Sequence, residues 1–101
     1  MNWNKPENRD LVNAFLSLQS EEEARRFLRD LLTPEEIEEF AKRLKAAAML
    51  IDKRPYSEIQ KKTGLSSTTV ARVSKWLNGK EAGYKTILSR LHHRRALARM
   101  G

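Results

Sequence analysis

The sequence predicts an all-α fold of six helices, and three observations support this prediction. Apolar residues recur at intervals of three and four rather than in the alternation of a β-strand. Two capping boxes, Ser20 with Glu23 and Thr33 with Glu36, mark the starts of helices. Residues 56–77 have the pattern of two short helices joined by a tight turn. With 40% hydrophobic and 33% charged residues, residues 1–101 suit a single small helical domain.

The first half of the chain is expected to form three helices. The first two span about residues 7–18 and 20–31. The third is the longest, beginning at Pro34, which suits a first helical position, and running to about Lys53, where Pro55 stops it. Its apolar positions recur at helical spacing and are Ile37, Phe40, Ala41, Leu44, Ala47, Ala48 and Ile51.

The segment Tyr56–Leu77 predicts a helix-turn-helix, with helices at Glu58–Lys62 and Ser67–Leu77. Gly64 follows the first helix, where a left-handed backbone costs glycine least. Ser66 stands at the N-cap of the second helix, which would be the recognition helix that enters the DNA major groove. The apolar residues expected to hold the two helices together are Ile59, Leu65, Val70 and Val73.

A homodimer is expected because short helices with apolar stripes need packing partners, and so small a monomer leaves many stripes uncovered. We expect the dimerisation helices to be about residues 7–53 together with a final helix over residues 84–100. Proteins with a helix-turn-helix also commonly bind two half-sites as two-fold dimers.

The net charge of +7 lies entirely in the second half of the chain. Residues 1–52 hold 8 Lys and Arg against 11 Asp and Glu, whereas residues 53–101 hold 12 against 2, a net charge of +10. A basic field confined to the half with the helix-turn-helix indicates a surface that binds polyanions, because phosphate neutralisation releases counterions. The alternative is a basic face that only keeps the protein in solution.

Several classes of function are not indicated. There is no cysteine, so we expect neither disulfides nor thiolate metal sites, and a cytoplasmic location. The sequence shows no apolar run long enough for a signal peptide or a membrane span. His92 and His93 point about 100° apart on a helix and lack nearby ligands, so no metal site is expected. No nucleophile motif or phosphate loop is present, and we expect no enzyme activity.

The segments Leu31–Glu36 and Gly64–Arg72, with Arg43 between them, resemble the tryptophan repressor superfamily, and most closely its YerC/YecD-type branch of small bacterial Trp repressor-like proteins. The resemblance covers about residues 10–95. It implies a six-helix, intertwined homodimer whose helix-turn-helix heads bind a palindromic operator and regulate transcription. Trp repressor is a standard example of this motif.

The resemblance also implies a corepressor pocket between the long helix and the recognition helix. Arg43 and Arg72 match two arginines that sandwich the ligand's indole ring, and Thr33 matches a threonine of the same pocket. Val73 replaces a glycine and Trp76 a serine, and both add bulk where the ligand would sit. We therefore expect no cofactor: a small-molecule corepressor stays open, tryptophan itself is disfavoured, and Trp76 is a candidate to fill the pocket.

The candidate DNA-binding residues lie mainly in the first turns of the recognition helix, which approach base edges. Hydroxyl groups can contact phosphate or bases, methyl groups can meet a thymine methyl, and lysines can bind phosphate. The alternative is that the hydroxyls are only capping groups on a solvated face. The candidates are Gln60, Lys61, Ser67, Thr68, Thr69, Ala71, Arg72 and Lys75.

The sequence thus predicts a sequence-specific, DNA-binding transcriptional regulator, expected to act as a repressor. One alternative is the DNA-binding module of a transposase or replication initiator. We expect the chain, which begins with Met, to be complete, and that weighs against an attached catalytic domain. The other alternative is a protein-interaction adaptor that has lost DNA binding, and the net charge of +10 in the second half weighs against it.

Overall fold

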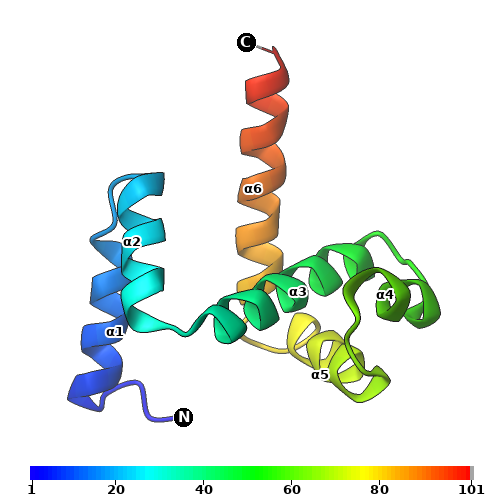
Figure 1. The fold of residues 1–101 in the computed structure, drawn as a ribbon, viewed down its shortest axis with the longest axis horizontal. Coiled ribbons are helices and arrows are strands. Elements are labelled where there is room, and N and C mark those ends of the chain that lie inside the picture. The colour runs from blue at the N-terminus through cyan, green and yellow to red at the C-terminus, as the bar shows by residue number, and fades with distance from the viewer. Residues whose placement is uncertain (101) are drawn as a thin grey trace. The chain divides into compact units, whose positions relative to one another are not determined.

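The computed structural model describes residues 1–100, and over this range the chain forms six α-helices and no strands (Figure 1). The all-α prediction is confirmed. No helix within these residues combines the length and the apolar character that crossing a membrane requires. The helices are α1 (Pro6–Leu16), α2 (Glu21–Leu31), α3 (Pro34–Ile51), α4 (Tyr56–Thr63), α5 (Ser67–Leu77) and α6 (Gly83–Met100).

The chain divides into two compact units, Met1–Ile37 and the part from Glu38 onward. In the first unit, the Phe15 and Phe27 rings of α1 and α2 pack edge to face, with centroids 5.6 Å apart. Neither helix contains a buried residue. α1 ends two residues earlier than predicted, because the Ser17 hydroxyl donates to the Ala14 carbonyl and closes the helix there.

The predicted capping box at α3 forms completely, whereas the one at α2 forms only in part. The Ser20 hydroxyl accepts from the Glu23 amide at 3.1 Å, while the Glu23 carboxylate accepts from the amide of Gln19. At the start of α3 the box is reciprocal: Thr33 Oγ1 accepts from the Glu36 amide at 3.1 Å, and Glu36 Oε1 accepts from the Thr33 amide at 3.0 Å. These bonds satisfy amides that a helix start otherwise leaves unpaired.

α3 ends at Ile51 rather than at about Lys53, and the cause is a Schellman motif instead of Pro55 alone. The Arg54 amide donates to the Met49 carbonyl and the Lys53 amide to the Leu50 carbonyl, both at 3.0 Å. Lys53 therefore adopts a left-handed backbone with φ of 60°. The early end frees Pro55 to act as the N-cap of α4, which begins at Tyr56, two residues before the predicted start.

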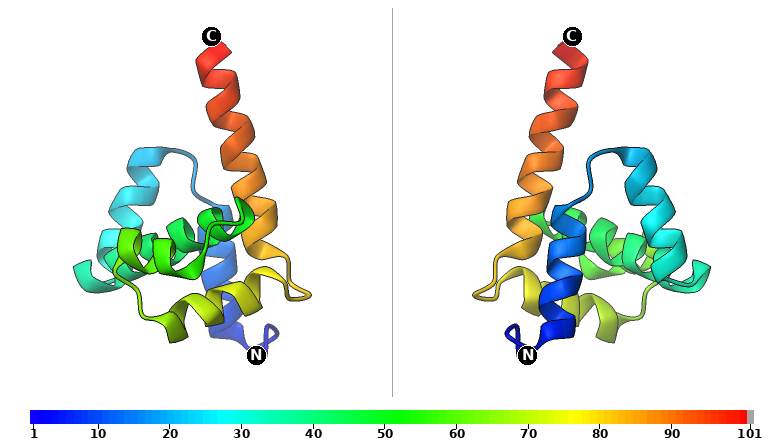
Figure 2. Two further views of the ribbon diagram at one scale, coloured as in Figure 1. Left: turned by 90° about the vertical axis from the view of Figure 1, so that its right-hand side faces the viewer. Right: turned by 90° about the vertical axis from the view of Figure 1, so that its left-hand side faces the viewer.

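The second unit contains the core, in which α3, α4 and α5 meet (Figure 2). The predicted apolar residues of the helix-turn-helix are all buried, as expected. On α3, Met49 is buried, whereas Phe40, Leu44 and Ile51 are exposed in the single chain. The apolar surface of α3 is wider than one stripe, and α4 and α5 cover only one side. The core consists of Ala46, Ala47, Met49, Ile59, Leu65, Val70 and Val73.

Candidate nucleic-acid interface

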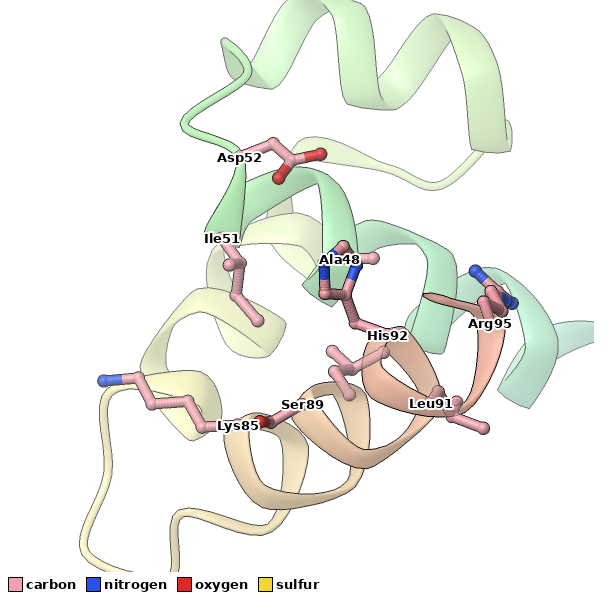
Figure 3. A pocket seen from close by; sticks show the side chains of 9 residues that line it. Ala48, Ile51, Asp52, Lys85, Ser89, Leu91, His92 and Arg95 are labelled. Atoms are coloured by element: carbon pink, nitrogen blue, oxygen red, sulfur yellow. The ribbon is translucent and has the colours of Figure 1, made fainter. Parts of the chain in front are cut away.

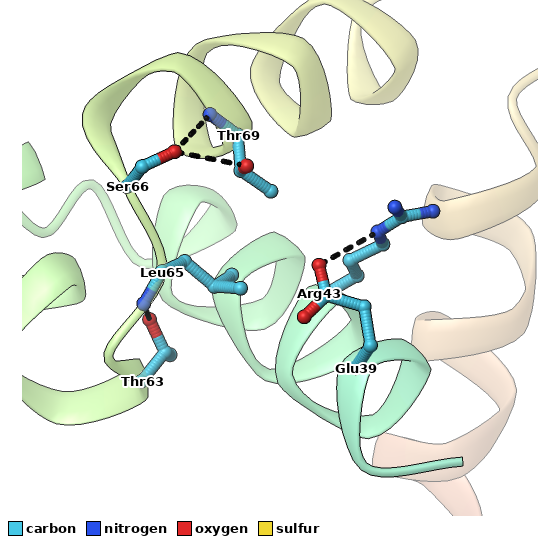
Figure 4. Close-up of polar contacts among 6 residues, drawn as sticks. All are labelled: Glu39, Arg43, Thr63, Leu65, Ser66 and Thr69. Carbon is cyan, nitrogen blue, oxygen red and sulfur yellow. Dashed lines mark hydrogen bonds and ion pairs between the residues drawn. The ribbon is translucent and has the colours of Figure 1, made fainter. Parts of the chain in front are cut away.

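The turn between α4 and α5 is closed by its own polar groups (Figure 4). Gly64 takes φ of 76°, as predicted, and its amide donates to the Gln60 carbonyl at 2.8 Å. The Thr63 hydroxyl donates to the Ile59 carbonyl at 2.7 Å and accepts from the Leu65 amide at 3.2 Å. Thr63 is buried, and both of these bonds keep its hydroxyl satisfied. The turn thus holds the two helices in one orientation.

Ser66 caps α5, as predicted, by accepting from the Thr69 amide at 3.1 Å. Its hydroxyl also lies 3.0 Å from Thr69 Oγ1. Of the predicted DNA-binding residues, Thr69 is half-buried, and its hydroxyl contacts the capping hydroxyl of Ser66. Ser67, the first residue of α5, is exposed.

Core packing decides which side of α5 faces outward. Val70, Val73 and Leu77 are buried against the rest of the unit. Four predicted residues lie on the opposite side, because each is three or four positions from two of the others, and each is exposed: Thr68, Ala71, Arg72 and Lys75. We call these four residues the reader stripe. Ala71 lies in the middle of the reader stripe, and its short side chain would let another molecule approach the helix backbone closely.

The two predicted residues on α4 differ in exposure. Lys61 is exposed, whereas Gln60 is half-buried. Arg54, just before α4, pairs with Glu58, which is one of only two acidic residues after position 52. Because Glu58 is the only acidic residue within residues 56–77, the charges of Lys61, Lys62, Arg72 and Lys75 leave the field around α4 and α5 positive.

Arg43 and Trp76, two of the predicted pocket residues, lie together in the structure. The Arg43 guanidinium carbon is 5.8 Å from the centre of the Trp76 ring and 5.5 Å from that of Phe40. Arg43 Nε lies 3.6 Å from a Glu39 carboxylate oxygen on the same helix, too far for a hydrogen bond, and is buried (Figure 4). Within the described part of the chain it has no hydrogen-bond partner.

The other predicted pocket residues are placed differently. Val73 is fully buried in the core, and Arg72 is exposed on the reader stripe. Thr33 belongs to the first unit, where its hydroxyl caps α3. Sequence reasoning did not find Phe40, although its spacing of three from Arg43 places the two side chains on one helix face. It also missed Tyr84, whose pKa is raised by burial and lowered to a smaller extent by the charge of Arg43.

A pocket of about 530 Å³ opens between α3 and α6, away from the predicted site residues (Figure 3). Its apolar side consists of Ala48, Ile51, Leu88 and Leu91. Asp52, Lys85, Ser89, His92 and Arg95 supply polar groups. Within residues 1–100 no cluster of His, Cys, Asp or Glu has the arrangement of a metal site.

A family model described as "Trp repressor protein" matches residues 7–92. The chain belongs to the Trp repressor family. This is a family of DNA-binding helix-turn-helix regulators and not of enzymes. The sequence is 41% identical over 81 residues to the uncharacterized protein YerC of Bacillus subtilis (strain 168). The aligned residues make up 80% of this chain and 78% of YerC.

The fold is also similar to that of a solved structure. A TrpR-like protein from Eubacterium eligens ATCC 27750 superimposes with a TM-score of 0.83 and is 36% identical. The match covers 89% of this chain and 93% of that one. The predicted resemblance to YerC-type Trp repressor-like proteins is confirmed.

Proposed function

We propose that this protein is a cytoplasmic, homodimeric repressor that reads a palindromic operator through α4 and α5. The reader stripe is the observation that supports this most strongly. It combines a hydroxyl group, a small methyl, a guanidinium and an ammonium on the exposed side of a capped helix that core packing holds in place. These groups match what base edges and phosphates bind.

Within the reader stripe the residues would have different tasks. Thr68 and Ala71 are short and lie nearest the start of α5, so they suit contacts with base edges, including a thymine methyl. Arg72 can bind guanine through two hydrogen bonds or contact phosphate. Lys75, with Lys61 and Gln60 on α4, suits contacts that position the duplex without reading its sequence.

The homodimer is supported by the poor burial of the first unit. α1 and α2 have no buried residue, and short helices draw most of their stability from packing. A second copy that covers these side chains would supply this packing. The exposed large hydrophobic residues of the first unit are Met1, Trp3, Leu11, Val12, Phe15, Leu16 and Leu31.

Selection of bound sequences from random duplex DNA tests the function. We expect a palindromic sequence whose half-sites lie about one helical turn apart, because a two-fold dimer presents two copies of α5. Sedimentation of the same protein should show a dimer at micromolar concentration. A single unpaired half-site with a monomer would favour a module of the transposase or initiator type.

The interaction-adaptor alternative gives a different result. A protein that has lost DNA binding would fail to bind any duplex, specific or random, even at low salt. The proposed function would then be wrong.

A further inference from the structure

Arg43 lies where three helices of the second unit meet. It belongs to α3 and faces Trp76 of α5, and its charge reaches Tyr84 of α6. On its own helix, Phe40 lies on the guanidinium as well. A single cationic group of α3 therefore lies against the helix-turn-helix.

The environment of Arg43 suits stacking rather than hydrogen bonding. Its Nε is buried without a hydrogen-bond partner among residues 1–100. Both ring centres lie within the distance of about 6 Å at which a cation attracts an aromatic face. Guanidinium is planar and weakly hydrated, so it stacks on rings better than the ammonium of lysine does.

Trp76 is not an ordinary core residue, because 48% of its surface is exposed. Phe40, whose ring also lies near the Arg43 guanidinium, is 43% exposed. Neither ring is held mainly by burial in the core. Each of the two rings makes a cation–π contact with Arg43.

The position of Trp76 relates this contact to the reader stripe. Trp76 lies four residues after Arg72, and therefore one turn further along the same side of α5. Val73 and Leu77, its neighbours toward the core, are buried. A contact that holds Trp76 on α3 consequently limits rotation of α5 about its own axis, and with it the direction of Arg72 and Lys75.

We infer that the cation–π contact between Arg43 and Trp76 is a built-in latch that orients the recognition helix without a small-molecule effector. Arg43 is in this sense a positioning residue, which acts on DNA binding through Trp76. The inference rests on the proposed DNA-binding function. Its consequence is that operator binding is constitutive, because the indole ring that stabilises α5 belongs to the chain itself.

The DNA-binding test compares two variants of Trp76 with the wild-type protein. Trp76→Ala should weaken operator binding about two- to fivefold for each protomer, and so up to about 25-fold for the dimer, the effect of losing one partly exposed cation–π contact per protomer. Trp76→Phe keeps a ring and should recover most of the affinity. Because Trp76 is half-exposed, thermal melts of both variants should confirm that they remain folded.

Free L-tryptophan tests whether an effector is required, since it carries the same ring as Trp76. At millimolar concentration it should leave the operator affinity of the wild-type protein unchanged. An increase in affinity on adding L-tryptophan would overturn the inference.

Fluorescence tests the stack without DNA. The chain has two tryptophans, so Trp3→Phe leaves Trp76 as the only indole fluorophore. In that background, Arg43→Met should shift the emission of Trp76 to the red and make it easier to quench with acrylamide. Arg43→Lys keeps the charge but not the planar guanidinium. The emission and quenching of Trp76 in this variant should therefore be closer to those of Arg43→Met than to those of wild type. Arg25→Met, at an exposed arginine of α2, is the control and should leave the emission unchanged.

The two hypotheses fail in different ways. If the wild-type protein binds no duplex at low salt, the proposed function is wrong and the role of the latch in DNA binding falls with it. If wild type binds DNA and Trp76→Ala binds equally well, only the latch is refuted. Unchanged Trp76 emission in Arg43→Met would also refute it.

Discussion

The two units of the chain have similar helix signals but very different burial. α2 and α5 are both 11 residues long, and each begins at a serine N-cap whose hydroxyl accepts from an amide at 3.1 Å. α5 buries Val70, Val73 and Leu77, whereas α2 buries no residue. Local capping therefore specifies where a helix starts, but packing decides whether it is stable alone. The second unit has its own core, whereas α1 and α2 of the first bury no residue, and we propose that a second copy covers them.

The largest expected effect contrasts one residue from each unit. Ile59→Ala removes a fully buried side chain and should lower the free energy of unfolding by about 2–5 kcal/mol. Leu16→Ala removes a side chain that is 77% exposed, so its effect on a dilute monomer should be within about 0.5 kcal/mol. Urea unfolding measures both.

Protein concentration sharpens this contrast. If a second copy covers the first unit, Leu16→Ala should weaken dimerisation in sedimentation at micromolar concentration. Equal losses of stability for both variants, independent of concentration, would contradict the difference between the units.

The second effect concerns two left-handed residues of the second unit. Gly64→Ala should lower the free energy of unfolding by about 1–2 kcal/mol, because φ of 76° is unfavourable for a residue with a Cβ. Lys53→Gly should raise it by less than about 1 kcal/mol, since strain is relieved while the unfolded chain gains entropy. Thermal unfolding measures the changes.

Gly83→Ala is the matched control for Gly64→Ala. A Cβ at either glycine would meet no atom within 4 Å, but Gly83 has no positive φ. Gly83→Ala should therefore leave stability unchanged or slightly improved. A large loss there would mean that steric crowding, and not the backbone angle, governs these positions.

The third effect compares the two serine caps. Ser66→Ala should cost about 1 kcal/mol of stability, because the Thr69 amide loses its acceptor. Ser20→Ala removes an equivalent bond in the first unit and should cost a similar amount only when that unit is packed in a dimer. Hydrogen exchange of the Glu23 and Thr69 amides measures the contribution of each serine cap separately. Equal exchange rates of both amides in a dilute monomer would contradict the comparison.

The smallest effect is a loss of stability at alkaline pH. Burial raises the pKa of Tyr84 above its usual value of 10.0 in the folded protein. The unfolded chain therefore releases this proton first, and the contribution of Tyr84 to stability is complete below about pH 10 and is lost as pH rises through the folded pKa. Tyr84→Phe should flatten the fall in stability above pH 10 in urea titrations. An identical fall in both proteins would show that Tyr84 does not contribute.

Much of the fold follows from local chemistry that the sequence displays. Thr33, Ser66 and Gly64 specify helix starts and the turn through their own hydrogen bonds or backbone angles, so they were predictable. The end of α3 was not, because a Schellman motif at Lys53 places a lysine where glycine is usual. The apolar surface of α3 surrounds much of the helix, so periodicity could not show that Met49 rather than Phe40 is buried.

The candidate site was predictable to a similar extent. The spacing of Thr68, Ala71, Arg72 and Lys75 already placed them on one helix face, opposite the buried valines. The contact of Arg43 with Phe40 and Trp76 depends on how α3 and α5 pack, which no local pattern contains. The hydroxyl of Thr69 looked equally available in the sequence, but the structure shares it with Ser66.

The salt dependence of duplex binding tests the central claim that α5 presents the DNA-binding surface. Lys75→Gln removes one exposed cation from the reader stripe. Arg25→Gln removes one from α2 and is the control. If Lys75 contacts a phosphate, the slope of log affinity against log salt should become shallower by about 1.8 in Lys75→Gln, about 0.9 for each protomer of the dimer, and stay unchanged in Arg25→Gln. Equal slopes in all three proteins, or no duplex binding at low salt, would contradict the account.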